Sequence, residues 1–231
     1  KLLILFFFSL FINSNLYSKS PLDTVSAGQV YKNQVYYSLN DGVVKEVPVE
    51  SWDIAFQTGQ NAGIHINGPK GIRVYHNPEL KIDDFDSTPD TTNLKENWNV
   101  WYNSDSTWNV GGFNLGMNGF ATNGNFGWGT YNPATHAVLG DELFLIELAD
   151  GSFKKIAIES LKGGVYNFKY AGLDGSNMEE VEIDKNNFPS KNFGYYSFTD
   201  GVVDPEPITD DWELLFSQYI VEIPMGPSSM D

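Results

Sequence analysis

The stretch that decides the fold is Tyr36-Tyr37-Ser38-Leu39-Asn40-Asp41-Gly42-Val43-Val44, followed by Ser51-Trp52-Asp53-Ile54-Ala55-Phe56. It is decisive because a close copy lies near the other end of the chain. The copy reads Tyr195-Tyr196-Ser197-Phe198-Thr199-Asp200-Gly201-Val202-Val203 and continues as Asp211-Trp212-Glu213-Leu214-Leu215-Phe216. Similarity in a fixed order indicates one supersecondary unit that is used twice. Each copy predicts a strand, an Asp-Gly turn, a second strand, and a polar connection into a third strand that begins at the Trp.

The composition predicts the same fold class along the rest of the chain. Aromatic residues make up 15% of the sequence, and Gly, Asn and Asp are plentiful. Aromatic strands joined by Gly, Asn and Asp turns are typical of antiparallel β proteins. Further strands are predicted at 64–67, 72–75, 143–148, 153–158 and 165–170, and 83–99 is predicted as a loop or ragged helix. We therefore expect an all-β protein of antiparallel sheets, with few or no helices after residue 20.

The chain divides into four segments on the sequence alone. Residues 1–20 begin with a lysine, continue with an apolar run and end with a polar stretch that contains small residues. This pattern predicts a secretory signal peptide that is cleaved after Ser18 or Ser20. Residues 21–178 form the expected main β domain. Residues 179–194 are polar and acidic, which indicates a linker, and 195–231 are expected to be the start of a second, repeated β unit that is cut short.

Cysteine usage and charge exclude several classes of function. The chain has no cysteine, so it has no disulfide, no cysteine-based zinc site, no thiol nucleophile and no Cys for a lipoprotein signal. With 14 Lys and Arg against 30 Asp and Glu, the net charge of −16 disfavours binding to nucleic acid or to an anionic lipid surface. We expect an exported protein that is periplasmic, associated with the outer membrane, or secreted.

Residues 98–131 combine large aromatic side chains with frequent Gly and Asn. Such a stretch is either an ordered loop that lines a pocket or a set of short strands packed into the core. The residues expected to line a pocket are aromatic: Trp101, Trp108, Phe113, Phe120, Trp128 and Tyr131.

Three blocks in order resemble the HmuY-like family of haem-binding proteins exported by Bacteroidetes-type bacteria. They are 37–56, Trp128-Gly129-Thr130-Tyr131-Asn132-Pro133-Ala134-Thr135-His136, and 143–170. The resemblance implies an all-β fold that holds haem between loops through two axial side chains, His or Met. It also implies a haemophore that captures haem for iron acquisition and passes it to an outer-membrane TonB-dependent receptor.

The family pattern differs here at the ligand positions. The position that corresponds to one axial ligand of the family falls near Asn132-Pro133, whereas His136 comes slightly later in the chain. The upstream region where the family has its other ligand, 98–110, contains neither His nor Met. Because haem iron is held by His, Met, Cys or Tyr, the ligand candidates are His136 and Met117. His65, in a strand-like Ile-His-Ile context, His76 and Tyr131 are weaker candidates.

Motifs for catalysis are missing from the sequence. It contains no Gly-x-Ser-x-Gly elbow, no phosphate-binding loop and no His-Glu-x-x-His helix. We therefore expect a protein that is not an enzyme. The many carboxylates do not exclude a catalytic pair of the glycosidase type. Two alternatives to haem binding remain: an extracellular module that binds carbohydrate or protein through the Trp cluster, and a structural domain without a ligand.

Overall fold

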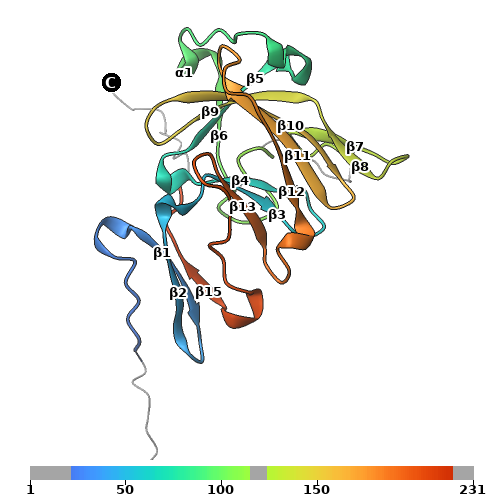
Figure 1. Cartoon of the computed structure of the whole chain (residues 1–231). Helices are drawn as coiled ribbons and strands as arrows, with labels where there is room; N and C mark the ends of the chain where they lie inside the picture. The colour runs from blue at the N-terminus through green and yellow to red at the C-terminus, as the bar shows by residue number, and fades with distance from the viewer. Residues whose placement is uncertain (1–21, 115–123, 221–231) are drawn as a thin grey trace, which may run out of the picture.

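The computed structural model describes residues 22–114 and 124–220. Its strands form three antiparallel sheets (Figure 1). Sheet A has the order β15 (Leu214–Phe216), β1 (Asn33–Ser38), β2 (Gly42–Pro48). Sheet B has the order β14 (Gly201–Val203), β13 (Phe193–Ser197), β3 (Ile54–Gln57), β4 (Ile64–Ile66).

Sheet C is the largest sheet, with eight strands. Its main path is β12 (Glu179–Asp184), β11 (Val165–Gly172), β10 (Phe153–Lys162), β9 (Glu142–Glu147), β5 (Arg73–Lys81), β6 (Asn99–Trp101). The hairpin of β7 (Gly129–Asn132) and β8 (Ala137–Gly140) joins it through the pairing of β8 with β10.

Helical structure within the described residues is limited to short pieces. The one α-helix is α1 (Leu94–Asn97), within the stretch expected to be a loop or ragged helix. The 3₁₀ turns are η1 (Gln29–Tyr31), η2 (Val49–Ser51), η3 (Gly68–Lys70), η4 (Ile82–Asp86), η5 (Lys185–Asn187) and η6 (Thr209–Asp211). The predicted all-β fold class of antiparallel sheets is confirmed.

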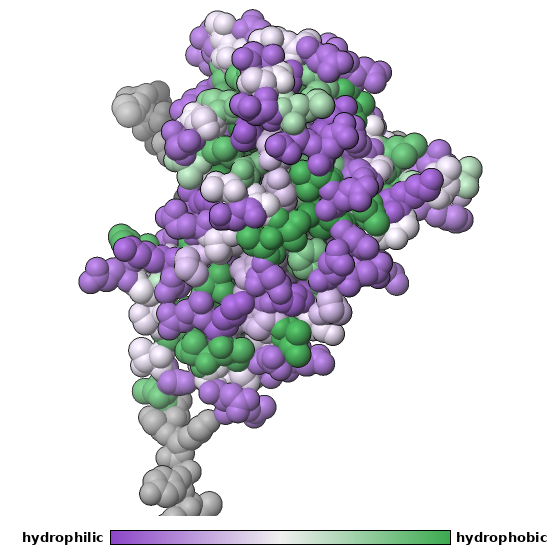
Figure 2. All heavy atoms as spheres, viewed as in Figure 1, coloured by the Kyte–Doolittle hydropathy of each residue, from purple (hydrophilic) through white to green (hydrophobic). Residues whose placement is uncertain are grey.

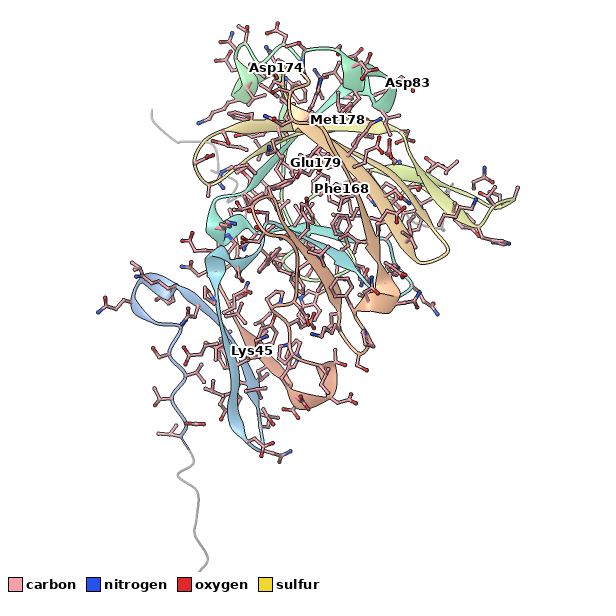
Figure 3. The ribbon with its side chains drawn as sticks, in the orientation of Figure 1. Lys45, Asp83, Phe168, Asp174, Met178 and Glu179 are labelled. Atoms are coloured by element: carbon pink, nitrogen blue, oxygen red, sulfur yellow. The ribbon has the colours of Figure 1, made fainter. Side chains whose placement is uncertain are left out.

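The main core lies between sheets B and C, because both sheets turn apolar side chains toward each other. On β3, Ile54 and Phe56 point into this core, while Ala55 between them points to the opposite face. The ring of Phe56 stacks on that of Phe168 from β11 at 5.1 Å between centroids, and Phe168 lies in the middle of the molecule (Figure 3). Sheet B therefore has one face in the core and one face toward sheet A.

The two copies of the repeated unit pair with each other reciprocally. The third strand of the first copy, β3, pairs with β13, the first strand of the second copy. The third strand of the second copy, β15, pairs with β1, the first strand of the first copy. Each copy thus completes the sheet that the other begins, and Figure 1 shows blue β1 and β2 beside red β15.

Equivalent side chains make equivalent contacts in the two copies. The ring of Trp52 packs edge-on against Tyr195 at 5.2 Å, and that of Trp212 packs edge-on against Tyr36 at 4.9 Å. The amide of Asp53 donates to the carbonyl of Tyr196, as the amide of Glu213 does to that of Tyr37. The repeat is therefore built with an approximate internal two-fold relationship.

Two predicted segment boundaries differ from the observed structure. Residues 179–184, expected to be a linker, form β12, the edge strand of sheet C. Its acidic residues had indicated a loop, but charged side chains are also common on exposed edge strands. Within 195–216, β13 and β15 pair with strands of the first copy in sheets B and A, and β14 pairs with β13. The expected signal peptide lies outside the described residues.

Candidate functional site

His136 lies in the turn of the β7–β8 hairpin, which extends from one side of sheet C (Figure 1). Its backbone has a positive φ of 52°, a conformation that few non-glycine residues adopt. The side chain is exposed. The turn holds the imidazole out of the core, where an incoming ligand can reach it.

Tyr131 at the end of β7 orients the His136 ring. Its hydroxyl lies 2.8 Å from Nδ1 of His136. A phenol oxygen can accept a hydrogen bond from Nδ1–H, and in that tautomer Nε2 carries the lone pair. Ligating histidines commonly have their second ring nitrogen fixed by such a partner. The contact with Tyr131 therefore restrains the His136 ring on the exposed turn.

The other aromatic candidates occupy three different environments. Phe113 and Trp128 are fully buried in the main core and do not line an opening. Trp128 donates from Nε1 to the carbonyl of Ala62 at 2.9 Å, which fixes it as a core residue. Trp101 is half-buried against His76 and Phe144. Phe120 and Met117 lie outside the described residues.

The Gly- and Asn-rich composition of this stretch has a structural explanation. The free edge of β4 is covered by side-chain amides instead of another strand. Asn103 bonds both the amide and the carbonyl of Ile66, and fully buried Asn114 accepts from the amide of Ile64 at 2.7 Å. A Cβ on Gly111 would lie 1.9 Å from the carbonyl oxygen of Ile64, so the close approach requires glycine there.

The remaining two histidines are buried and already bonded. His65 in β4 is 8% exposed, and its Nε2 donates to the carbonyl of Trp108 at 2.8 Å. Burial lowers the pKa of His65 to about 4, although the hydrogen bond to Trp108 acts in the opposite direction. His65 is therefore a neutral structural residue at neutral pH, and of the chain's three histidines only His136 is exposed.

His76 in β5 belongs to a small ionic cluster that sequence reasoning missed. Its Nε2 lies 2.9 Å from Oε2 of Glu142, whose other oxygen lies 2.7 Å from Nζ of Lys81. Burial raises the pKa of Glu142, but the bonds from His76 and Lys81 more than offset this and leave the pKa lowered. Since Glu142 lies on β9, only the pairing of β5 with β9 brings the cluster together.

Trp108 lies at a separate place, on the wall of a cavity between sheets A and B. It is 46% exposed, and none of the other described pocket candidates lines this cavity. The structure thus divides the predicted aromatic pocket: Tyr131 lies beside His136, Trp108 lines the cavity, and Phe113 and Trp128 lie in the core. No cluster of three or more metal-ligating His, Cys, Asp or Glu occurs within the described ranges.

A protein-family model for the HmuY protein matches residues 30–170. The chain belongs to the HmuY family. The match spans the first copy of the repeat, the β7–β8 hairpin with His136, and the strands of sheet C up to β11. Neither the search of curated proteins nor the search of solved structures gave a match.

Membership of the HmuY family supports a role related to haem binding, in a family that is not enzymatic. The second copy of the repeat lies beyond the matched residues, although it supplies β13 in the middle of sheet B. No helix of the described segments is long and apolar enough to cross a membrane.

Proposed function

We propose that this protein is a haem carrier that holds the iron through His136. The observation that carries the proposal is the position of His136 within the HmuY match, exposed on a hairpin turn and fixed at Nδ1 by Tyr131. Histidine is one of the side chains that hold haem iron in proteins. His65 and His76 are unsuited to the role because both are buried and bonded.

Met117 is the proposed second axial ligand, on sequence grounds alone. Methionine and histidine together form a known ligand pair for haem iron. The segment that holds Met117 begins after Asn114 and ends before Gly124, and the carbonyl of Gly124 accepts from the amide of Tyr131 at 2.8 Å. The chain therefore returns from this segment directly beside the hairpin that carries His136.

The proposed location and biological role rest on the family and on the expected signal peptide. We propose that the chain is exported through the segment 1–20, captures haem outside the cytoplasm, and delivers it to an outer-membrane TonB-dependent receptor. The role is that of a carrier, without catalysis. Its acidic surface agrees with a partner other than nucleic acid, and hydrophilic residues cover much of the face in Figure 2.

The test is a titration of the full chain with ferric haem, followed by visible absorption. We expect a saturable shift of the Soret band at one haem per chain, with low-spin bands if both ligands bind. His136→Ala and Met117→Ala should each weaken binding at least about tenfold, equal to about 1.4 kcal/mol. Thr135→Ala, on the same exposed turn, is the matched control and should leave the spectrum unchanged.

Two outcomes would contradict the proposal. An unaltered Soret band in the wild-type chain would remove haem binding. A normal spectrum and affinity in His136→Ala would keep haem binding but remove His136 as the ligand.

A further inference from the structure

Sheet A has an outer face that carries apolar side chains. The sheet forms the end of the molecule away from sheet C, with sheet B between them (Figure 1). Its inner face holds Tyr36 and Leu215, which line the cavity toward sheet B. Because side chains alternate along a strand, Tyr37, Leu214 and Phe216 point outward. The ring of Tyr37 packs edge-on against that of Phe216 at 6.0 Å between centroids.

The apolar side chains of this outer face are largely exposed. Leu214 is 42% exposed and Phe216 is 41% exposed. Val43, which pairs with Tyr37 across the hairpin, is 46% exposed, and Leu39 in the adjoining turn is 67% exposed. Adjoining apolar side chains of this kind mark an interaction site on a soluble protein. These five residues form the sheet A patch: Tyr37, Leu39, Val43, Leu214 and Phe216.

The internal repeat shows what kind of surface this face is built to receive. Leu214 occupies the position of Ile54 in the other copy. Phe216 likewise occupies the position of Phe56. Ile54 and Phe56 are both 0% exposed, because sheet C covers their face of sheet B. The contact is direct, since Phe56 stacks on Phe168 of β11. Equivalent positions are therefore a core face in sheet B and an exposed face in sheet A.

The same relation holds for the first strand of each copy. Tyr37 corresponds to Tyr196, which is 6% exposed and packs edge-on against Phe168 of sheet C. Leu39 corresponds to Phe198, which packs against the same core. A sheet buries such a face against a second sheet about 10 Å away. The surface that fits the sheet A patch is therefore the apolar face of another β-sheet.

A second copy of this chain offers a face of that kind. The outer side of sheet C is covered by η4 through Phe85 and by the α1 region through Trp98. Sheet B has one face in the main core and the other toward sheet A. Within 22–114 and 124–220, the sheet A patch is thus the apolar sheet face that stays uncovered. A two-fold axis brings the same patch of two chains together, so the patch can cover itself.

The charges beside the sheet A patch are acidic and set its expected salt dependence. Asp23 accepts from the hydroxyl of Tyr37, and Glu213 accepts from the amide of Leu39. Two such faces would bring like charges together, on chains that each carry a net charge of −16. Salt screens this repulsion, because the Debye length falls from about 10 Å at 0.1 M to about 3 Å at 1 M. Burial of apolar surface is not screened in this way, so salt should favour association.

We propose that the sheet A patch is a self-association surface, through which two copies of the chain pack sheet A against sheet A about a two-fold axis. The two faces then form a core like the one that sheets B and C form within each chain. Because sheet A has three strands, the contact is small, and the dimer is weak and concentration-dependent. His136 lies on the β7–β8 hairpin of sheet C, so the surface is separate from the proposed haem site.

Sedimentation equilibrium of the full chain, over a range of micromolar concentrations, tests the proposal. We expect a reversible equilibrium between monomer and dimer. The dissociation constant should be at least about threefold lower in about 0.5 M NaCl than in about 0.05 M NaCl, because salt screens the acidic residues. An association held by surface ion pairs would show the opposite dependence.

Two variants place a charge within the sheet A patch. Phe216→Lys and Leu214→Lys should each raise the dissociation constant at least about tenfold, because dimerisation would bury an unpaired ammonium group. Val202→Lys is the matched control. Val202 is 54% exposed, lies on β14 of sheet B and corresponds to Val43 in the other copy, so its variant should dimerise like wild type. The urea midpoint of each variant shows that it is folded.

A second measurement needs no variant. On dilution of the wild-type chain, the amide resonances of 37–43 and 214–216 should shift, and those of 129–140 should stay in place. Dilution shifts centred outside sheet A would overturn the proposal, as would a dimer that both lysine variants leave unchanged. A monomer at every concentration and both salt levels would also overturn it, and would mean that a different protein covers the face. None of these results alters the haem titration, so the two proposals succeed or fail separately.

Discussion

The three histidines of the chain occupy three different environments. His65 is buried and neutral, His76 is buried against Glu142, and His136 is exposed on a turn. The Ile-His-Ile context of His65 correctly indicated a structural strand position, because both neighbours point into the core. Nothing local to His76 indicates Glu142, which lies 66 residues away and meets it only through the pairing of β5 with β9.

His65 should make the stability of the protein depend on pH. Its pKa is about 4 in the folded chain against about 6.5 when unfolded, so the unfolded chain binds more protons between these values. Stability should therefore fall as the pH drops through this window. We expect wild type to lose on the order of 1–2 kcal/mol more than His65→Gln between pH 7 and pH 5, measured by urea unfolding.

His65→Gln is the matched comparison because its amide can still donate to the carbonyl of Trp108 but does not titrate in this range. Other acidic groups titrate equally in both proteins. An equal loss of stability in the two chains would show that His65 contributes no pH dependence.

At the scale of the element, the strongest local sequence signal was the Asp-Gly turn. Gly42, Gly151 and Gly201 follow Asp at three hairpins, and all three have positive φ values between 78° and 85°. Only glycine adopts such values readily, so the dipeptide is informative on its own. β12 was missed because Glu179, Glu180 and Glu182 are polar, and its strand conformation comes from pairing with β11.

The acidic residue after each repeat Trp provides an element-scale prediction. Asp53 is 3% exposed, with Oδ1 2.7 Å from Nζ of Lys70 and Oδ2 accepting from the amide of Phe198 at 2.7 Å. Glu213 is exposed and accepts from the amide of Leu39. Asp53→Ala should cost about 3 kcal/mol, because it leaves the partly buried Lys70 and the amide of Phe198 without their carboxylate partner. Glu213→Ala should cost below about 1 kcal/mol.

Urea unfolding of both variants beside wild type measures the difference. The comparison is matched, because the two residues occupy equivalent positions of the two copies. An equal loss in the free energy of unfolding for the two variants would contradict this account. It would mean that the hydrogen bond from the turn amide, which both carboxylates accept, matters more than the ion pair of Asp53 with Lys70.

At the scale of the whole molecule, the sequence showed that a segment is repeated, but not how the two copies pair with each other. Two similar segments 159 residues apart, measured from Tyr36 to Tyr195, are visible in the chain. Their exchange of third strands depends on long-range pairing that no local pattern encodes. The same limit applies to the aromatic stretch, whose residues are distributed between the core, the β7–β8 hairpin and the cavity. His136 could be named as a candidate from the sequence because its family context is local, whereas the cavity requires both copies together.

The central claim is that haem binds at the β7–β8 hairpin, and paramagnetic broadening of assigned amide resonances by ferric haem tests it most directly. The account predicts that one equivalent of haem broadens the amides of 129–140 most strongly and leaves those around Trp52 and Trp212 sharp. Broadening centred on the cavity between sheets A and B, or none at saturating haem, would contradict it.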